Sequence, residues 1–353
     1  MENNLTKESD LRSLSIVELK KLMESLGEKS YRADQLFDWI HNKQISDLSQ
    51  MKNISASLKE KLRLQGYEIF ETSLLLCRRS KLDETRKYLI KLKDDDIIES
   101  VFMKYEHGNS VCVSSQVGCR MGCRFCASTI DGLKRNLTAG EMLGQIYEIM
   151  KDTGERISNV VIMGSGEPLD NYENVVTFIR LLNSKEGLNM SQRNITLSTC
   201  GIVPMIKRLR DEDLKITLAI SLHSPEDEKR KEIMPIASKY SLKELMEACR
   251  YYYEDNKRRI TFEYSLIEGV NDSVEDAMKL SQLLRGLNAH VNLILVNPVK
   301  ERDFVQPDKR KAFEFQNKLE KNHINVTIRR DLGRDIEGAC GQLRRRYKES
   351  TNC

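Results

Sequence analysis

The fold of this chain can be worked out from one stretch, Val111-Cys-Val-Ser-Ser-Gln-Val-Gly-Cys119-Arg-Met-Gly-Cys123-Arg-Phe-Cys126. Its first half, residues 111–117, is rich in valine and predicts a buried strand. Its second half places three cysteines on a tight loop directly after that strand. Reactive side chains at the carboxyl end of a strand are typical of α/β proteins. The stretch therefore predicts an α/β fold with its chemistry at the strand ends.

The chain downstream continues this alternation of strands and helices. Thr138 and Glu141 form a capping box, which predicts a helix start. Further strands are predicted at residues 159–163, 195–198, 216–221, 260–266, 291–296 and 326–329, and helices at residues 172–182, 242–252, 274–284 and 312–319. The strands are far enough apart for parallel crossovers of a dozen or more residues. We expect a parallel barrel or an open parallel sheet.

Two other regions are predicted before this core. Residues 1–70 are expected to form a small helical accessory domain, possibly in contact with RNA, because Ser15 and Glu18 form a capping box followed by apolar residues at helical spacing. Residues 71–106 predict strands broken by an acidic turn at residues 94–96. They are expected to be a β-rich extension that leads into the core.

The core is expected to span residues 107–343, followed by a basic tail at residues 344–353. A length of 353 residues with 40% hydrophobic and 31% charged residues indicates a globular protein and excludes a disordered one. No apolar run approaches the roughly 20 residues that a transmembrane helix needs, and residues 1–20 lack the apolar core of a secretory signal. We expect a cytoplasmic protein. Its net charge of +4 is too small to indicate nucleic-acid binding by itself.

The spacing of the cysteines limits the kinds of metal site that they can form. Nine cysteines in a reducing compartment are more often ligands or reactive thiols than disulfides. Cys119, Cys123 and Cys126 have no histidine or fourth cysteine at the spacing that a structural zinc site needs. Three thiolates suit an iron–sulfur cluster that keeps one iron open to a substrate. Structural zinc and unbound thiols are the alternatives.

The same spacing, with an aromatic residue before Cys126, resembles the radical S-adenosylmethionine (SAM) superfamily. Gly164-Ser-Gly-Glu167-Pro168, directly after a predicted strand, is similar to the glycine–glutamate–proline motif of that superfamily. The resemblance implies a radical SAM partial (β/α)6 TIM-type barrel and a 4Fe-4S cluster on Cys119, Cys123 and Cys126, whose open iron chelates SAM. The residues that it implies as SAM contacts are Gly166, Glu167, Ser198, Ser221, Leu222, His223 and Asn297.

Longer blocks narrow the resemblance to the RNA adenine methyltransferases of the RlmN and Cfr group. They extend over nearly the whole chain and are Ser114-Ser-Gln-Val-Gly-Cys119, Asn136-Leu-Thr-Ala-Gly-Glu141, Ser221-Leu-His-Ser-Pro225, Met234-Pro-Ile236, Tyr264-Ser-Leu-Ile-Glu-Gly-Val-Asn-Asp272 and Asp335-Ile-Glu-Gly-Ala-Cys-Gly-Gln-Leu343. One departure is Ala127-Ser-Thr-Ile-Asp131, where many members have Ala-Thr-Gly.

This resemblance implies methylation at C2 of an adenine in 23S ribosomal RNA, near the peptidyl-transferase centre, and in certain transfer RNAs. Because C2 is electron-poor, a radical is needed. The resemblance makes Cys340 the methyl carrier, an S-methylcysteine formed from one SAM, while a second SAM gives the 5′-deoxyadenosyl radical. It also implies that Cys112 attacks Cys340 to free the product, leaving a disulfide, and that Glu99 removes the C2 proton.

The expected partners are the RNA substrates and a low-potential electron donor such as flavodoxin or ferredoxin, with the enzyme acting as a monomer. Basic residues that could hold RNA phosphates surround Cys340, although the last of them could also form a solvated tail. They are Arg329, Arg330, Arg334, Arg344, Arg345, Arg346 and Lys348.

Three alternatives stay open. The first is methylation at C8 as in Cfr. Pro168 argues modestly against it, because Cfr tends to have alanine at this position. The second, from a different class, is a zinc-stabilised RNA-binding protein without catalysis. A radical enzyme acting on a protein or a small molecule is the weakest alternative, since it leaves Cys112 and Cys340 without a role.

Overall fold

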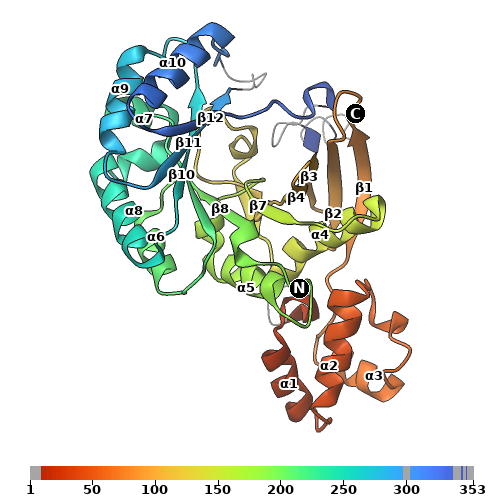
Figure 1. Ribbon diagram of the computed structural model, residues 1–353. Coiled ribbons are helices and arrows are strands. Elements are labelled where there is room, and N and C mark those ends of the chain that lie inside the picture. The colour runs from red at the N-terminus through yellow and green to blue at the C-terminus, as the bar shows by residue number, and fades with distance from the viewer. Residues whose placement is uncertain (1–8, 297–302, 337–342, 345–346, 348–353) are drawn as a thin grey trace.

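A computed structural model describes residues 9–296, 303–336, 343–344 and 347. Its strands are β1 (Thr72–Arg79), β2 (Arg86–Leu92), β3 (Ile97–Tyr105), β4 (Gly108–Cys112), β5 (Gln116–Gly118), β6 (Leu133–Asn136), β7 (Asn159–Ile162), β8 (Ile195–Thr199), β9 (Thr217–Ser221), β10 (Ile260–Leu266), β11 (Ala289–Leu295) and β12 (Asn325–Ile328). Ten of them form one sheet in the order β1-β2-β3-β4-β7-β8-β9-β10-β11-β12 (Figure 1). From β4 to β12 every neighbouring pair is parallel.

Helices connect the parallel strands. They are α4 (Ala139–Thr153), α5 (Tyr172–Asn183), α6 (Val203–Arg210), α7 (Asp227–Ile233), α8 (Leu242–Asn256), α9 (Val274–Leu283) and α10 (Lys309–Lys321). At least one helix lies between each parallel strand and the next, so six strand–helix units precede β12. This is the partial (β/α)6 barrel that the sequence predicts. The predicted capping box of Thr138 and Glu141 is confirmed at the start of α4.

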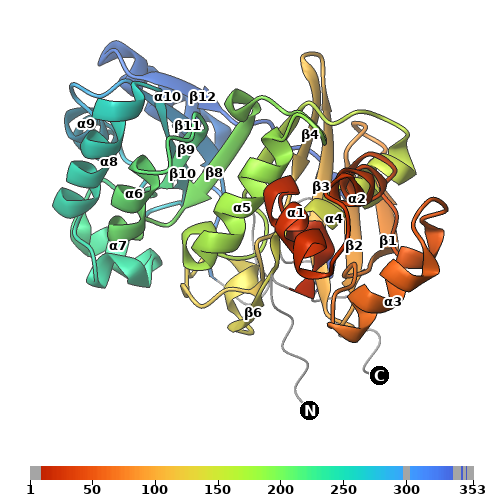
Figure 2. The ribbon, with the colours of Figure 1, turned by 90° about the horizontal axis from the view of Figure 1, so that it is seen from below.

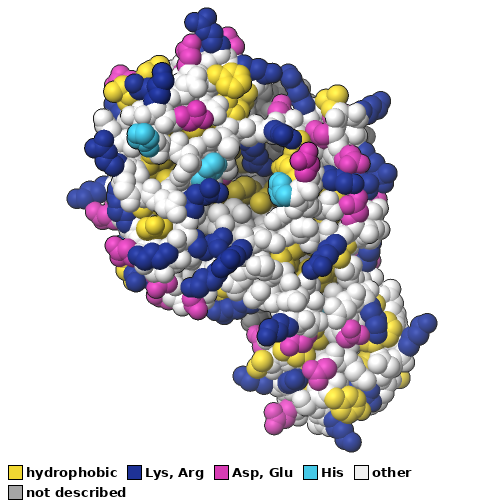
Figure 3. All heavy atoms as spheres, in the orientation of Figure 1, with side chains coloured by type: hydrophobic (Ala, Val, Ile, Leu, Met, Phe, Trp, Pro, Cys, Tyr) yellow, Lys and Arg dark blue, Asp and Glu magenta, His cyan; other side chains and the backbone are white. Residues whose placement is uncertain are grey.

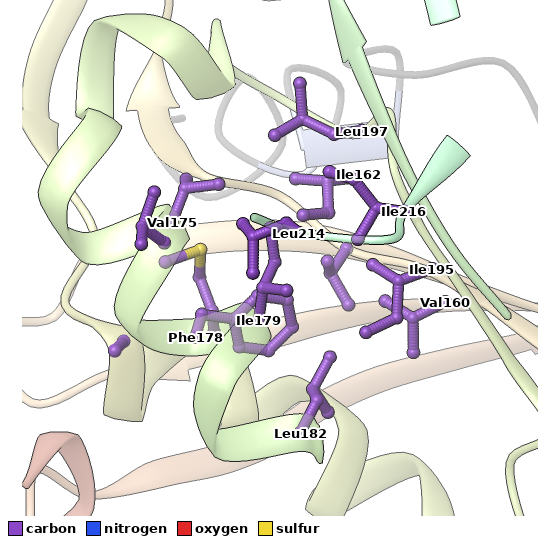
Figure 4. Packing of buried hydrophobic residues seen from close by; sticks show 14 of the residues in the cluster. Val160, Ile162, Val175, Phe178, Ile179, Leu182, Ile195, Leu197, Leu214 and Ile216 are labelled. Atoms are coloured by element: carbon purple, nitrogen blue, oxygen red, sulfur yellow. The ribbon is translucent and has the colours of Figure 1, made fainter. Parts of the chain in front are cut away.

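The apolar side chains of α5 pack on the sheet (Figure 4). Phe178, Ile179 and Leu182 of α5 and Val160 and Ile195 of the sheet belong to one core cluster, and each is fully buried. Burying a side chain of this size contributes about 1.5–3 kcal/mol. This packing fixes the helix against β7 and β8, and so fixes the loops at their carboxyl ends.

One strand prediction is wrong. Residues 111–117 form two strands, β4 in the large sheet and β5 in a separate hairpin with β6. The break occurs because Ser114 and Ser115 bond elsewhere: Ser114 N–H donates to Gln145 Oε1 at 2.8 Å, and Ser115 N–H donates to Ser165 O at 2.9 Å. The chain therefore leaves the large sheet just before the cysteines.

The sequence analysis did not predict β6, α6 or α7. The sequence of α7, Asp-Glu-Lys-Arg-Lys-Glu-Ile, has no apolar stripe. The helix is nevertheless anchored, because Arg230 in it is 1% exposed and bonds to backbone carbonyls. A buried arginine cannot be recognised from hydrophobic periodicity.

Three helices form the N-terminal region: α1 (Ile16–Ser25), α2 (Tyr31–Phe37) and α3 (Ala56–Leu64). The predicted capping box of Ser15 and Glu18 is confirmed. The helices lie beside α4 and α5 (Figure 2). Arg12, which is 1% exposed, donates to Phe70 O at 3.2 Å, and His41 Nδ1 lies 2.8 Å from the Tyr147 hydroxyl of α4. No helix in the described ranges is long and apolar enough to cross a membrane.

Strands β1, β2 and β3 extend the same sheet in antiparallel order up to β4. Residue Val101 of β3 lies opposite Cys112 of β4, and Glu99 lies two residues before it on β3. The extension thus brings the predicted proton acceptor to the neighbourhood of a predicted reactive thiol.

Candidate active site

The hairpin of β5 and β6 holds the cysteine loop at its base. Gly118, the last residue of β5, has φ +79°, and a Cβ atom there would lie 2.0 Å from Gly132 O. Glycine is therefore required directly before Cys119. Cys119 N–H donates to Gly132 O at 2.9 Å. The first cysteine is positioned by the backbone of the hairpin.

Hydrogen bonds within the loop orient the other two cysteines. Cys126 N–H donates to Cys123 O at 3.1 Å. The Thr129 hydroxyl lies 3.0 Å from Cys123 O and 2.9 Å from Cys126 O. Arg120 forms an ion pair with Asp170, which lies in the 3-10 turn Pro168–Asn171 after β7. The loop is thereby tied to the carboxyl end of the parallel sheet.

All three cysteines line one cavity of about 280 Å³, which we call the cysteine cavity. Cys119 and Cys123 are buried. Burial raises the pKa of Cys119 to about 12, with a further contribution from the nearby Cys126 thiol, and burial also raises the pKa of Cys123. These thiols are protonated on their own, and they need a bound cation to become thiolates.

The donor set fits an iron–sulfur cluster. Three soft thiols on one loop are the ligands that such clusters take. Across the described ranges, no three cysteine, histidine, aspartate or glutamate side chains converge closely enough to hold a single metal ion. The three thiols of the loop instead stand around the wall of the cavity.

The motif after β7 forms the opposite wall. Gly166 has φ +109°, and a Cβ atom there would lie 2.6 Å from Gln116 Cβ, so glycine lets the motif lie directly against β5. Glu167 is 3% exposed and lines the cavity. Its Oε2 accepts from Cys200 N–H at 2.7 Å and its Oε1 from Leu169 N–H at 3.0 Å. Burial raises the pKa of Glu167, although these bonds oppose the rise.

Three predicted SAM contacts at the ends of β8 and β9 also line the cysteine cavity: Ser198, Ser221 and His223. His223 Nδ1 accepts from Ser265 N–H at 2.9 Å, which leaves the proton of a neutral imidazole on Nε2. Burial, assisted by Arg230, lowers the pKa of His223 to about 3. The ring is therefore neutral, and it packs edge-on against Phe125 of the cysteine loop.

Two other predicted SAM contacts stand apart. Leu222 is fully buried in the hydrophobic core and does not line the cavity, so only its backbone is near the site. Its N–H donates to Glu263 O at 3.0 Å. Asn297 lies outside the described residues.

A second cavity of about 230 Å³, which we call the Glu99 cavity, adjoins the first. Glu99 and Cys112 both line it. Both cavities share the same wall, made of Met163, Gly164, Ile294 and Arg329. The structure thus brings the predicted proton acceptor and one predicted reactive thiol to the border of the cysteine cavity.

Glu99 is held from two sides. Its Oε2 forms a buried ion pair with Lys87 Nζ at 3.2 Å, with the two side chains 3% and 0% exposed. Its Oε1 accepts from Arg344 N–H at 2.5 Å. Charge-assisted bonds of this kind fix a carboxylate in one orientation.

The pKa of Cys112 is raised, chiefly by burial. The positive charges of Arg329 and Lys87 oppose this rise, whereas Glu99 adds to it. A thiol with cationic neighbours is easier to deprotonate than one in an apolar site. Cys340, the other predicted reactive thiol, lies outside the described residues.

Part of the predicted basic region can be placed. Arg329 and Arg330 line the Glu99 cavity. Arg344 is 4% exposed and so is not part of a solvated tail. Arg334 is exposed, and the rest of the set, Arg345, Arg346 and Lys348, lies outside the described residues. Lysine and arginine side chains are spread around the hollow on the face shown in Figure 3.

Sequence reasoning missed three residues of the site. Cys200 and Glu263 line the cysteine cavity, and Arg230 joins its strands by donating to Cys200 O at 2.8 Å and Leu222 O at 3.1 Å. One signal was available: Glu263 is a charged residue in the middle of Ile-Thr-Phe-Glu-Tyr-Ser-Leu, a strand that is buried throughout.

Two known protein families match parts of this chain. Residues 113–281 match the model of the radical SAM superfamily. Residues 9–67 match the model of the ribosomal RNA large subunit methyltransferase N-terminal domain. The first match contains the three clustered cysteines and the motif after β7, and the second contains α1, α2 and α3.

Relatives match over almost the entire chain. The chain is 58% identical over 347 residues to a probable dual-specificity RNA methyltransferase RlmN from Lachnospira eligens, covering 97% of both. It is 53% identical to the protein of the same name from Lachnoclostridium phytofermentans, covering 99% of this chain and 98% of the relative.

A solved structure agrees with the fold. The crystal structure of a radical SAM methyltransferase from Sphaerobacter thermophilus matches with a TM-score of 0.89 and 40% identity, covering 94% of this chain and 98% of the other. Membership of a radical SAM family implies a 4Fe-4S cluster and SAM, and it favours them over structural zinc. The chain belongs to the RlmN family of radical SAM RNA methyltransferases.

Proposed function

We propose that this protein methylates C2 of an adenine in 23S ribosomal RNA and in certain transfer RNAs. The observation that carries the proposal is the pair of adjoining cavities, one lined by three clustered thiols and the other by Glu99 and Cys112. In this proposal the radical precursor binds on one side of the shared wall, and the proton acceptor Glu99 and the thiol of Cys112 lie on the other. The RlmN family membership gives the reaction its class.

Cys119, Cys123 and Cys126 hold the 4Fe-4S cluster in this proposal. When bound, the cluster and SAM supply a carbon-centred radical that can react at an electron-poor ring carbon. Glu167, Ser198, Ser221 and His223 line the same cavity and bind the SAM. Because His223 is neutral and protonated on Nε2, it can donate one hydrogen bond without adding charge.

The Glu99 cavity receives the target adenine. Glu99 accepts the C2 proton, and Lys87 holds its carboxylate in place at the cavity. Cys340 carries the methyl group donated by one of two SAM molecules per turnover. Cys112 then attacks the sulfur of Cys340. A Cys112–Cys340 disulfide forms as the bond between that sulfur and the methylene carbon on C2 breaks, and this carbon takes up a proton to become the methyl group. The disulfide is then reduced.

RNA and redox partners complete the proposal. Arg329 and Arg330 line the Glu99 cavity, where they can bind phosphates of the RNA beside the adenine. A base in a stacked or paired position has to be turned out of its helix to reach this depth. The electrons come from a low-potential donor such as flavodoxin or ferredoxin, and the enzyme acts as a cytoplasmic monomer.

Nucleoside analysis tests the proposal. RNA from a strain whose only copy of the enzyme is this chain is digested and separated against C2- and C8-methyladenosine standards. We expect C2-methyladenosine with the wild type and with a Cys77→Ala control, and none with Cys340→Ala. C8-methyladenosine would instead support the Cfr-like alternative, and C2-methyladenosine in the Cys340→Ala strain would exclude the methyl-cysteine mechanism.

A further inference from the structure

Glu263 is a buried carboxylate that the proposed steps leave without a role. It lies in the middle of β10, is 3% exposed and lines the cysteine cavity. Every other residue of β10 is also buried. Because burying a carboxylate is costly unless it is bonded, its partners indicate what it is for.

One oxygen of Glu263 is satisfied and the other is not. Oε1 accepts from Asn292 Nδ2 at 2.9 Å. Asn292 Oδ1 in turn accepts from the Thr327 hydroxyl at 3.0 Å, which fixes the amide. Oε2 is buried and has no hydrogen-bond partner. The carboxylate is thus held in place with one acceptor atom unused.

The backbone of Glu263 is joined to the segment that is proposed to bind SAM. Glu263 lies opposite Ser221 in the parallel pairing of β10 with β9. Its carbonyl oxygen accepts from Leu222 N–H at 3.0 Å and from His223 N–H at 3.3 Å. Ser221, His223 and Glu263 therefore form one side of the cysteine cavity, whereas Glu167 lies in the turn after β7.

The position within the sheet indicates which part of SAM meets Glu263. The cysteine loop and Glu167 are fixed to one another next to β7, and they belong to the cluster end of the cavity. Glu263 on β10 is three strands further along the sheet order from β7. A SAM molecule whose methionine end lay beside Glu167 would extend its nucleoside end along the strand ends toward β10.

We propose that Glu263 Oε2 accepts a hydrogen bond from a ribose hydroxyl of SAM. This assignment rests on the proposed use of the cysteine cavity for SAM. A carboxylate beside a nucleoside pocket commonly binds ribose hydroxyls, because a diol supplies donors that a carboxylate accepts. Asn292 positions the carboxylate. Burial raises the pKa of Glu263, and the charge of nearby Arg329 and the Asn292 hydrogen bond oppose this rise.

The test measures binding rather than turnover. Anaerobically reconstituted holoenzyme is titrated calorimetrically with SAM and with its 2′-deoxy and 3′-deoxy analogues. We expect one of the two deoxy analogues to bind the wild type roughly 10- to 100-fold more weakly than SAM, as the loss of a charge-assisted hydrogen bond predicts. In Glu263→Met, SAM should bind as weakly as that analogue does.

Two controls keep the result interpretable. Glu268→Gln changes a partly exposed carboxylate five residues further along and should bind SAM as the wild type does. Glu263→Leu is a second apolar replacement, and it serves if Glu263→Met fails to fold. Equal wild-type affinity for SAM and both deoxy analogues would overturn the assignment without any variant.

Other outcomes also decide the question. A Glu263→Met or Glu263→Leu enzyme that keeps the full preference for SAM over the deoxy analogue would overturn the assignment. A binding preference for SAM that depends on the adenine 6-amino group instead of a ribose hydroxyl would also overturn the assignment. If SAM binds with the expected preference but no methyladenosine forms in RNA, the proposed function fails and the role of Glu263 stands.

Discussion

The cysteine cavity and the Glu99 cavity share a wall but are built in different ways. The three clustered thiols of the first come from eight consecutive residues, Cys119 to Cys126, and backbone hydrogen bonds position them. The polar groups of the second come from β2, β3, β4 and the far end of the chain, and an ion pair between Lys87 and Glu99 positions the carboxylate. One cavity is defined by a local motif and the other by tertiary assembly.

Because the two cavities are built differently, substitutions in them should have different effects on the protein. A change in the cysteine loop should remove the cofactor while the protein remains folded, because few core contacts depend on the thiols. A change in the Glu99 cavity should weaken the whole fold, because it leaves a buried charge between strands. The following experiments test this contrast, in order of decreasing expected effect.

Cys123→Ala should have the largest effect on chemistry. Removing one of three cluster ligands should abolish the reducible 4Fe-4S signal in electron paramagnetic resonance and reduce RNA methylation to background. The circular dichroism spectrum should be unchanged. Cys77→Ala is the matched control, because Cys77 lies on β1 away from both cavities. This variant should keep the cluster. A full cluster in Cys123→Ala would contradict the assigned ligand set.

Lys87→Met should have the largest effect on stability. Removing one partner of a buried ion pair leaves Glu99 uncompensated and typically costs about 3–5 kcal/mol. Chemical unfolding of the variant measures this loss. The double variant Lys87→Met/Glu99→Gln removes both charges and should regain part of the stability. A double variant less stable than Lys87→Met alone would show that the pair is not the cause.

Gly118→Ala should destabilise the base of the cysteine loop by about 3 kcal/mol, because it adds strain at positive φ and a collision with Gly132 O. Gly154→Ala is a matched control: Gly154 also has positive φ, 66°, but no atom lies within 4 Å of its Cβ position. It should cost about 1 kcal/mol. Thermal unfolding of both variants gives the comparison, and equal losses would rule out the collision.

The smallest expected effect is a change in how the stability of the protein depends on pH. His223 has its pKa lowered to about 3 in the folded protein, so the unfolded chain binds the extra proton as the pH falls below about 6.5. Stability from this group is present above that pH and is lost on acidification, by about 1.4 kcal/mol at pH 5.5. Unfolding of the cluster-free protein at pH 7.5 and 5.5, compared with His223→Gln, isolates this loss. A variant with the same pH dependence as the wild type would contradict the burial of a neutral ring.

The fold was largely predictable because its strands and helices obey simple patterns. β10 has the predicted bounds, residues 260–266, and β3 lies within the predicted β-rich region, residues 71–106. The prediction failed where tertiary contacts replace local preference. Ser114 leaves its strand to bond with Gln145 of α4, and α7 is anchored by the buried Arg230 instead of an apolar stripe.

The candidate site, like the fold, could be predicted where its residues are close together in the sequence, and it could not where tertiary contacts decide. The roles of Cys119, Cys123, Cys126 and Glu167 could be proposed from the sequence because their spacing is local. Glu263 could not, because its importance depends on an unpartnered oxygen and on a partner on another strand.

The sequence by itself therefore determined the alternation of strands and helices, the ligand loop and the family of the protein, because each depends on residues close together along the chain. Only the tertiary structure decided that Lys87 pairs with Glu99, that Arg344 is buried against it and that Glu263 faces the cysteine cavity. These contacts join residues from distant parts of the chain, and their energies depend on burial, which no local pattern specifies.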